Sequence, residues 1–344
     1  MNFLSEYGIF LLESITVVVA ILITFACMVA LKVKAKQSKK GKVLIESLSK
    51  KFKENKQRLQ KEICDGNVLK QLFKAEKKQK KLSKKQSKKQ TDNPKRLFVI
   101  DFHGDIQASE VEALREMITV ILQLANNKDE VLIRLESAGG MVHAYGLCAS
   151  QLQRLKQHGI HFKVSIDKVA ASGGYMMACV ADKILAAPFA VIGSIGVIVQ
   201  MPNFNRLLAK KDIEFEQITA GKYKRTLTLF GKNTKENRAK MQQDVEETHD
   251  LFKDFVSEQR PQLDIKKVAT GEHWFGTRAL ELNLVDQITT SDDYILDFYN
   301  QIDSKVFRVF YKEKNTAFEK MVGKKTADSI KNLLLGATSV SRVY

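Results

Sequence analysis

Closely spaced cysteines are missing from this chain. Its four cysteines, Cys27, Cys64, Cys148 and Cys179, lie far apart, with no Cys-x-x-Cys spacing among them. A disulfide framework or a zinc site uses cysteines at short, regular spacings. Neither is expected here, and the cysteines that lie in apolar runs are predicted to be reduced and packed in the protein interior.

Most of the chain also lacks a net charge, although the whole chain has a formal net charge of +17. Residues 32–89 hold 22 of the 56 Lys and Arg residues but only 5 of the 39 Asp and Glu residues, so the remainder carries 34 of each sign. This Lys-rich segment has little aromatic interleaving and permits amphipathic helices broken near residues 65–66. We expect it to be solvated or to attract anionic membrane lipids rather than nucleic acid.

The N-terminus has neither positive charge nor a cleavage site. The first eight residues contain no Lys or Arg, and no small-x-small sequence follows the apolar residues 9–31. We therefore expect a retained transmembrane anchor, long enough to cross a bilayer, rather than a secretory signal peptide. Lysines follow from residue 32, and by the positive-inside rule they place the rest of the chain in the cytoplasm.

From residue 95 onwards, strand-like and helix-like stretches alternate. The expected strands are residues 97–101, 131–135, 162–166, 183–186 and 213–218, and the expected helices are residues 110–124 and 142–156. Repeated β-α units predict an α/β domain with a largely parallel sheet. The apolar residues 186–199 are too short to cross a membrane and contain Gly and Pro, so they predict a buried strand or strand-turn instead.

A serine followed by two glycines lies between a predicted strand and an entirely apolar stretch. Residues 175–181, directly after them, must be buried on all sides if they form a helix. Gly173 and Gly174 at the helix start cost about 0.5–1 kcal/mol each relative to Ala, which suggests that another group approaches the backbone closely. Ser172 is then either a nucleophile beside free N–H groups or a helix N-cap. This stretch alone does not decide between them.

Two further turns bear on the chemistry. Gly139 and Gly140 follow the predicted strand 131–135 and expose N–H groups that could bind an oxyanion, although such turns are also ordinary connections. Lys222 and Lys224 follow the predicted strand 213–218, where lysines are usually solvated.

Four motifs, in order, resemble the signal-peptide-peptidase A family of Ser–Lys peptidases. They are Leu135-Glu-Ser-Ala-Gly-Gly140, Ala171-Ser-Gly-Gly-Tyr175, Gly193-Ser-Ile-Gly-Val197 and Gly221-Lys-Tyr-Lys224. The Lys-rich extension and Asp101-Phe-His-Gly-Asp-Ile106 are closest to that family's branch of inner-membrane peptidases. The resemblance covers residues 1–302. It implies an α/β fold of the crotonase-like (Clp-protease-like) type behind an N-terminal transmembrane helix.

The resemblance also implies a role for each site residue. The nucleophile falls on Ser172, the general base on Lys224, the serine that holds the base on Ser194, and the oxyanion donors on Gly139 and Gly140 with the Gly173 N–H. Where the family usually has Ser-Pro-Gly-Gly, this chain has Ala138. Losing the proline loosens the turn by about 0.4–1 kcal/mol but leaves both glycine N–H groups in place.

The implied organisation runs from membrane to catalytic domain. The expected segments are a short tail (1–8), the anchor (9–31), a Lys-rich juxtamembrane segment and linker (32–94), the peptidase domain (95–302), and a C-terminal strand with a basic tail (303–344). The implied protein is a single-pass bacterial inner-membrane endopeptidase that cleaves unfolded or membrane-derived peptides. The resemblance also implies a homo-oligomer, an octamer if the dome of the single-copy members is followed.

The proposed chemistry sets its own requirements. A lysine acts as a base only when neutral, so burial must lower its pKa from about 10.4 toward about 7, which corresponds to about 4 kcal/mol. Acyl transfer through a serine then needs no metal or organic cofactor.

Four alternatives stay open at this point. His103 or His143 could belong to a Ser-His-Asp triad, since both lie near strand ends, and Lys222 could replace Lys224 as the base. A crotonase-type acyl-CoA enzyme would share the fold, and a catalytically weak membrane scaffold could have kept it. The sequence around His273 and Trp274 is interpreted as structural, near subunit contacts.

Overall fold

The computed structural model describes residues 15–19, 41–72, 74–75, 78 and 94–313. The chain divides into two compact units, one formed by residues 1–44 with 311–344 and the other by residues 45–310. In the first unit, residues 15–19 are helical and the Gly41 N–H donates to the Tyr311 hydroxyl at 2.7 Å. Among the described residues, none of the helices has the length and apolar character needed to cross a bilayer. The expected anchor at residues 9–31 lies outside the described residues except for 15–19, as do Cys27 and the tail beyond residue 313.

The described strands form one sheet, whose pairs with a known register are all parallel except β7–β8. Its main order is β1-β10-β2-β3-β4-β6-β9, while β5 pairs with β3 and β7, and β7 also pairs with β8. The strands are β1 (Lys42–Ser47), β2 (Lys95–Gly104), β3 (Glu130–Ser137), β4 (His161–Ile166), β5 (Val169–Ala171), β6 (Lys183–Ala186), β7 (Val191–Gly193), β8 (His273–Phe275), β9 (Gln287–Ile288) and β10 (Ser304–Lys312). The predicted α/β class with a largely parallel sheet is confirmed.

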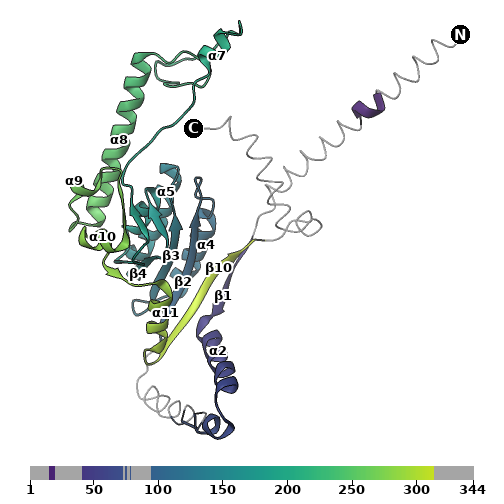
Figure 1. The fold of residues 1–344 in the computed structure, drawn as a ribbon, viewed down its shortest axis with the longest axis vertical. Helices are drawn as coiled ribbons and strands as arrows, with labels where there is room; N and C mark the ends of the chain where they lie inside the picture. The colour runs from purple at the N-terminus through teal and green to yellow at the C-terminus, as the bar shows by residue number, and fades with distance from the viewer. Residues whose placement is uncertain (1–14, 20–40, 73, 76–77, 79–93, 314–344) are drawn as a thin grey trace, which may run out of the picture. The chain divides into compact units, whose positions relative to one another are not determined.

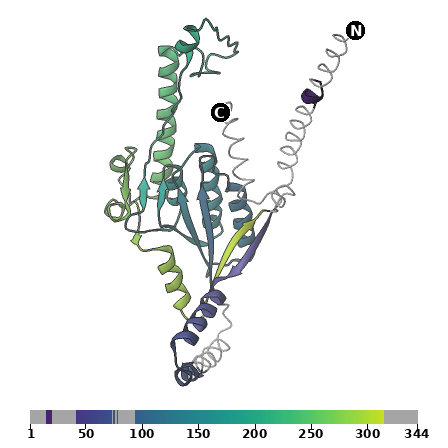
Figure 2. The same ribbon diagram turned by 45° about the vertical axis from the view of Figure 1, so that its right-hand side comes forward.

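Helices connect these strands and cover the sheet (Figure 1). They are α2 (Leu48–Ile63), α4 (Val111–Leu124), α5 (Val142–Gln157), α6 (Gly173–Ala178), α7 (Asn205–Ala209), α8 (Lys235–Gln259), α9 (Ile265–Val268), α10 (Gly276–Glu281) and α11 (Ser291–Asn300). Threonine side chains cap two of these helices: Thr234 accepts the Asn237 N–H at the start of α8, and Thr290 accepts the Asp293 N–H at the start of α11. In Figures 1 and 2, α7 lies at the end of α8 that is remote from the sheet.

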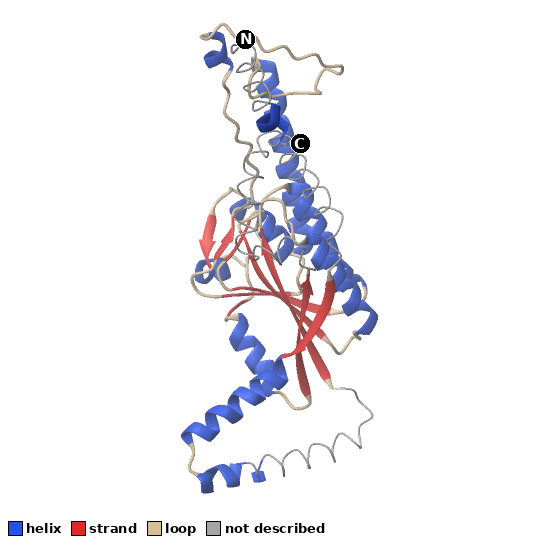
Figure 3. Cartoon of the chain, turned by 90° about the vertical axis from the view of Figure 1, so that its right-hand side faces the viewer, coloured by secondary structure: helices blue, strands red, loops and turns tan. Residues whose placement is uncertain are grey.

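The core forms on both faces of the sheet because its central strands are apolar on both sides. On one face, Leu97, Val99 and Leu132 pack with Ile295 and Phe298 of α11. Helices α4 and α5 bury their apolar stripes as well, and Figure 3 shows helices beside the crossing strands. The stretch predicted to be buried on all sides is so: every residue from 175 to 181 is buried.

Two segments differ from what the sequence suggested, and for residues 213–218 the predicted strand is wrong. Residues 213–218 do not form a strand, and Ile213 and Ile218 are 54% and 96% exposed. Among the described strands, none pairs with residues 213–218, and an isolated strand would leave its backbone groups unpaired. Residues 42–47 form strand β1, in the segment whose apolar spacing permits amphipathic helices. The helix break near residues 65–66 is confirmed, since α2 ends at Ile63 and helix resumes at Gly66.

Candidate active site

The carboxyl ends of four parallel strands meet in one part of the sheet. Gly104 at the end of β2 pairs with Ser137 at the end of β3, and Ser137 pairs with Ala170 of β5. Ala171 at the end of β5 pairs with Gly193 at the end of β7. In open α/β sheets, ligands bind outside the carboxyl ends of the strands. The residues that follow these strands include Gly139, Gly140, Ser172, Gly173 and Ser194, which the sequence had singled out.

Ser172 has a strained backbone at the start of α6. Its φ is 52° and its ψ is −119°, and it makes no side-chain cap to the helix. Such a conformation costs a non-glycine residue of the order of 1–3 kcal/mol, and strain of this kind is concentrated at functional sites. Two hydrogen bonds hold it: the Ser172 N–H donates to the Gly193 carbonyl at 2.8 Å, and its own carbonyl accepts the Met176 N–H at 3.0 Å. The plain N-cap interpretation therefore does not describe Ser172.

The two glycines after Ser172 are packed tightly against the protein. A Cβ added to Gly173 would lie 2.5 Å from Cγ of the Tyr145 ring, and one added to Gly174 would lie 2.5 Å from the Ser137 carbonyl oxygen. The close approach predicted from the sequence is confirmed. The approaching groups are the Tyr145 ring and the Ser137 backbone of the same chain. Sequence reasoning missed Tyr145, because no spacing pattern marks a tyrosine within a helix as part of a site.

The Gly139–Gly140 turn lies directly against Ser172. Gly139 has a φ of +90°, and a Cβ there would lie 2.8 Å from the Ser172 Cβ and 2.7 Å from the Gly173 nitrogen. A Cβ on Gly140 would collide with the Ile106 carbonyl. Only glycine fits these positions, so the turn approaches the serine more closely than any other residue type would allow.

The backbone N–H groups of Gly140 and Gly173 have no acceptor among the described residues, and the same holds for the Gly174 N–H in the first turn of α6. The Gly139 N–H, by contrast, donates to the Ser137 Oγ at 3.0 Å. Unpartnered donors beside a serine are what an oxyanion site requires. The Gly139 N–H is engaged within the turn, so Gly140 and Gly173 supply the open donors.

Ser194 lies beside the residue that anchors Ser172. It follows β7 with a φ of 51° and is half-buried, and its N–H donates to the Glu272 carbonyl at 2.6 Å. The preceding residue, Gly193, accepts the Ser172 N–H. The structure therefore brings Ser194 to the same strand ends as Ser172.

Lys224 is not brought to Ser172 in the single chain. Its side chain is exposed, and its N–H donates to the Gly221 carbonyl at 3.1 Å within a turn. It belongs to residues 197–234, which we call the arm, between β7 and α8. Within the described residues, no titratable side chain forms a hydrogen bond to the Ser172 hydroxyl.

Lys222 is engaged elsewhere. Its ammonium pairs with Glu236 at 2.9 Å and lies over the Tyr223 ring. The hydrogen bond to Glu236 leads the causes that raise the pKa of Lys222 to about 12. A lysine held protonated in this way is a poor base at neutral pH.

The histidine alternative finds no support in the geometry. His103 and His143 are both exposed, and His103 Nδ1 lies 3.7 Å from a Glu136 carboxylate oxygen. Neither forms a hydrogen bond to Ser172 within the described part of the chain. His273 and Trp274 form strand β8, whose Trp274 ring packs over Gly193, in keeping with a structural role.

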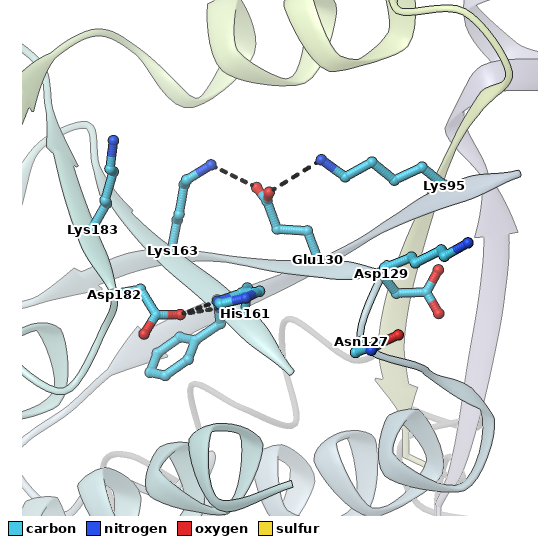
Figure 4. A pocket seen from close by; sticks show the side chains of 10 residues that line it. Lys95, Asn127, Asp129, Glu130, His161, Lys163, Asp182 and Lys183 are labelled. Carbon is cyan, nitrogen blue, oxygen red and sulfur yellow. Dashed lines mark hydrogen bonds and ion pairs between the residues drawn. The ribbon is translucent and has the colours of Figure 1, made fainter. Parts of the chain in front are cut away.

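A cavity of about 690 Å³ lies at the opposite, amino ends of the strands. Figure 4 shows its charged wall, where Lys95 and Lys163 pair with Glu130, and His161 faces Asp182. It contains none of the predicted site residues. Over the described residues, no group of three or more His, Cys, Asp or Glu side chains is arranged to hold a metal ion.

Comparison with known proteins identifies the family. The chain matches "Peptidase family S49 N-terminal" over residues 2–152 and "Peptidase family S49" over residues 154–304. It is 50% identical over 341 residues to the probable protease SohB of Haemophilus influenzae, covering 97% of this chain and 96% of that protein. It is 51% identical over 306 residues to the probable protease SohB of Buchnera aphidicola subsp. Schizaphis graminum, covering 86% of each.

Structural similarity is weaker. A mutant of the 1510-N membrane-bound stomatin-specific protease aligns with 60% of this chain and 85% of its own length, at 15% identity and a TM-score of 0.41. That score is too low to establish a shared fold, so the crotonase-like assignment stays a prediction. The sequence matches extend over nearly the whole chain, and they confirm the resemblance drawn from the four motifs: this chain belongs to peptidase family S49.

Proposed function

We propose that the chain is a serine endopeptidase in which Ser172 is the nucleophile and Lys224 is the general base. One observation carries the proposal: Ser172 is held in a strained conformation at a helix start, beside the unpartnered N–H groups of Gly140 and Gly173. A nucleophile on such a turn presents its hydroxyl outward, next to donors that can stabilise an oxyanion.

The proposed reaction has two halves. Ser172 Oγ attacks the scissile carbonyl carbon while its proton passes to the neutral Lys224 amine, and the Gly140 and Gly173 N–H groups stabilise the oxyanion. Lys224 then gives the proton to the leaving amine as the peptide bond breaks. Water attacks the acyl-enzyme with Lys224 again as the base, which releases the acid and restores Ser172. Ser194, half-buried beside the anchor of Ser172, is proposed to hold the Lys224 amine.

Assembly of several copies is proposed to complete the site. The arm that carries Lys224 exposes large apolar side chains, with Ile198 74% and Ile218 96% exposed. Exposed apolar surface of this kind marks an interaction site. Burying it against a neighbouring copy would remove water from Lys224 and bring the lysine to a serine. This homo-oligomer, with an octamer as the expected form, would also enclose the sites.

The location and substrates are part of the same proposal. Residues 9–31 form the anchor in a bacterial inner membrane, the catalytic domain faces the cytoplasm, and the Lys-rich residues 32–94 adjoin anionic lipids. A peptidase held there meets unfolded or membrane-derived peptides.

The test compares two serines. Full-length protein in detergent or liposomes is assayed for cleavage of an unfolded protein, alongside Ser172→Ala and Ser150→Ala. Ser150 is exposed on α5, and its hydroxyl donates to the Gly146 carbonyl. Ser172→Ala is expected to abolish cleavage and Ser150→Ala to retain it. Wild-type cleavage by Ser172→Ala would overturn the proposal.

A further inference from the structure

Tyr145 connects the two turns that flank the candidate oxyanion site. It lies in the first turn of α5 and is fully buried. Its hydroxyl donates to the Asp105 carbonyl at 2.7 Å. Asp105 begins the turn after β2, which is closed by the Ala108 N–H donating to the same carbonyl. One side chain from a helix therefore holds the turn that follows β2.

The same hydroxyl reaches the turn after β3 through Ser137. The oxygens of Ser137 and Tyr145 lie 2.6 Å apart, and Ser137 is buried. Because the single tyrosyl proton is used on Asp105, Ser137 must donate to Tyr145. The Ser137 Oγ in turn accepts the Gly139 N–H at 3.0 Å. Each donor in this chain has an acceptor, as a buried polar network requires.

This network fixes the peptide that carries the Gly140 N–H. On one side the Gly139 N–H is bound to Ser137, and on the other the Met141 N–H donates to the Ile106 carbonyl at 2.8 Å. The Gly140 N–H lies between these two anchored amides, so its direction is set by them. The ring of Tyr145 also packs on Gly173, which carries the second open donor.

We propose that Tyr145 and Ser137 are positioning residues that aim the Gly140 and Gly173 N–H groups at the oxyanion of the transition state. The inference rests on the proposed role of Ser172 and adds residues that touch neither the substrate nor the reacting atoms. Donors stabilise a transition state only when they are aimed before the reaction begins. Loosening them should therefore slow the chemical step and leave substrate binding unchanged.

Tyr145→Phe isolates this role from packing. The substitution keeps the ring against Gly173 and removes only the hydroxyl, so Ser137 loses its acceptor and the Gly139 N–H its fixed partner. The Asp105 carbonyl still accepts the Ala108 N–H. Burial raises the pKa of Tyr145, so its hydroxyl remains a neutral donor throughout the assay range.

The experiment measures kcat and KM on a peptide for full-length Tyr145→Phe, Ser137→Ala and the double variant. Tyr294→Phe is the control, because it also loses a tyrosyl hydroxyl in a polar network, a half-buried one that contacts Glu130 and Lys163 at the opposite ends of the strands. Each variant is also labelled with a fluorophosphonate. The rate of labelling reports the alignment of the donors, and the final extent of labelling reports the folded fraction.

We expect kcat to fall about 10- to 100-fold in Tyr145→Phe, less than the 10²–10³ for removing a donor outright, with KM unchanged. Ser137→Ala should match it and the double variant should be no worse, since both act through one chain of bonds. Labelling should be slower but reach the wild-type extent, and Tyr294→Phe should keep the wild-type kcat.

Several results would overturn the inference. They are a wild-type kcat in Tyr145→Phe, a rise in KM instead, or an equal loss in Tyr294→Phe that follows the melting temperature. If Tyr145→Phe does not fold, Ser137→Ala gives the same test alone. Cleavage that survives Ser172→Ala would overturn the proposed function together with this inference. If Tyr145→Phe and Ser137→Ala keep the wild-type kcat while Ser172→Ala is inactive, only the positioning role is overturned and Ser172 remains the nucleophile.

Discussion

Ser172 and Lys224 lie in regions of the chain that are held in different ways. Around Ser172 the backbone is fixed by parallel strand pairing, by glycines in close contact and by the buried Tyr145. In the arm, aromatic contacts are few, and the Phe215 and Phe230 rings lie 5.7 Å apart. Much of the remaining stabilisation comes from hydrogen bonds that amide side chains such as Asn203 donate to backbone carbonyls. The proposed nucleophile is therefore held within one chain, whereas the proposed base lies on an exposed turn.

The difference separates two tasks of the site. A nucleophile and its oxyanion donors need fixed geometry, which strand pairing and tight packing supply within a single core. A lysine acts as a base only when removal of water lowers its pKa, and an exposed arm loses water only when another surface covers it. In the proposed mechanism, the fold of one chain holds the oxyanion donors, and assembly removes water from the base.

Replacing the base should have the largest effect. Lys224→Ala is expected to lower kcat by about 10²–10⁴-fold or more, because it removes general-base catalysis. The secondary-structure content should not change, since the Lys224 side chain is exposed in the single chain. Lys222→Ala is the matched control and should retain most activity, because Lys222 pairs with Glu236. Equal loss in both variants would contradict the assignment.

Mixing variants shows which copy supplies the lysine. Ser172→Ala and Lys224→Ala are each expected to be inactive. If a ring assembles head to tail and Lys224 acts on a neighbour, randomly mixed oligomers should regain about a quarter of the sites. No recovery after subunit exchange would assign both residues to the same copy.

The pH dependence distinguishes a lysine from a histidine base. A lysine is protonated over most of the neutral range, so the rate should rise about tenfold per pH unit and continue to rise above pH 7.5. A histidine base would reach its plateau soon after about pH 6.5. A plateau there, together with an inactive His143→Gln variant, would favour the triad.

Glycine substitutions should separate tight packing from open space. Gly173→Ala places a methyl group against the Tyr145 ring and should lower the free energy of unfolding by about 1–3 kcal/mol, with loss of activity. Gly146, next to Tyr145 in α5, has nothing within 4 Å of an added Cβ. Gly146→Ala should stabilise the protein by about 0.5–1 kcal/mol through helix propensity. Urea denaturation measures both, and equal effects would contradict the packing argument.

The charge pairs of Asp101 should affect stability and leave the candidate active site unchanged. Asp101 has 14% of its side chain exposed and accepts from Arg134 at 2.6 Å and from Arg308 at 2.8 Å. Burial alone would raise the pKa of Asp101, but the hydrogen bonds and charges of the two arginines outweigh it and hold the pKa below its usual value. The carboxylate therefore stabilises the fold fully above about pH 4, its unfolded value, and this is lost as pH falls through the lower folded value.

Asp101→Asn should lower the free energy of unfolding by about 1–3 kcal/mol at pH 7, and the deficit should disappear in acid. Asp250 on α8 is the control, since its carboxylate pairs with Lys253 at the surface. Asp250→Asn should leave the urea midpoint unchanged. A deficit in Asp101→Asn that persists in acid would refute the linkage argument.

The sequence was informative where structure is local. The strands before the site, the buried stretch 175–181 and the close approach to Gly173 all follow from runs of apolar residues and paired glycines. It failed where an outcome depends on a distant partner. Residues 213–218 have strand composition but no strand to pair with, and Tyr145 acts through contacts that no spacing reveals. Lys224 likewise lies on an exposed turn, and the surface proposed to cover it belongs to another copy of the chain.

The most direct test of the account is fluorophosphonate labelling of assembled, full-length protein, followed by peptide mass spectrometry. The account predicts one modified residue, Ser172, at full occupancy in the wild type and in Lys222→Ala. Labelling should be absent in Ser172→Ala and slowed by orders of magnitude in Lys224→Ala. Modification of a different serine, or labelling of Ser172 at the wild-type rate without Lys224, would contradict it.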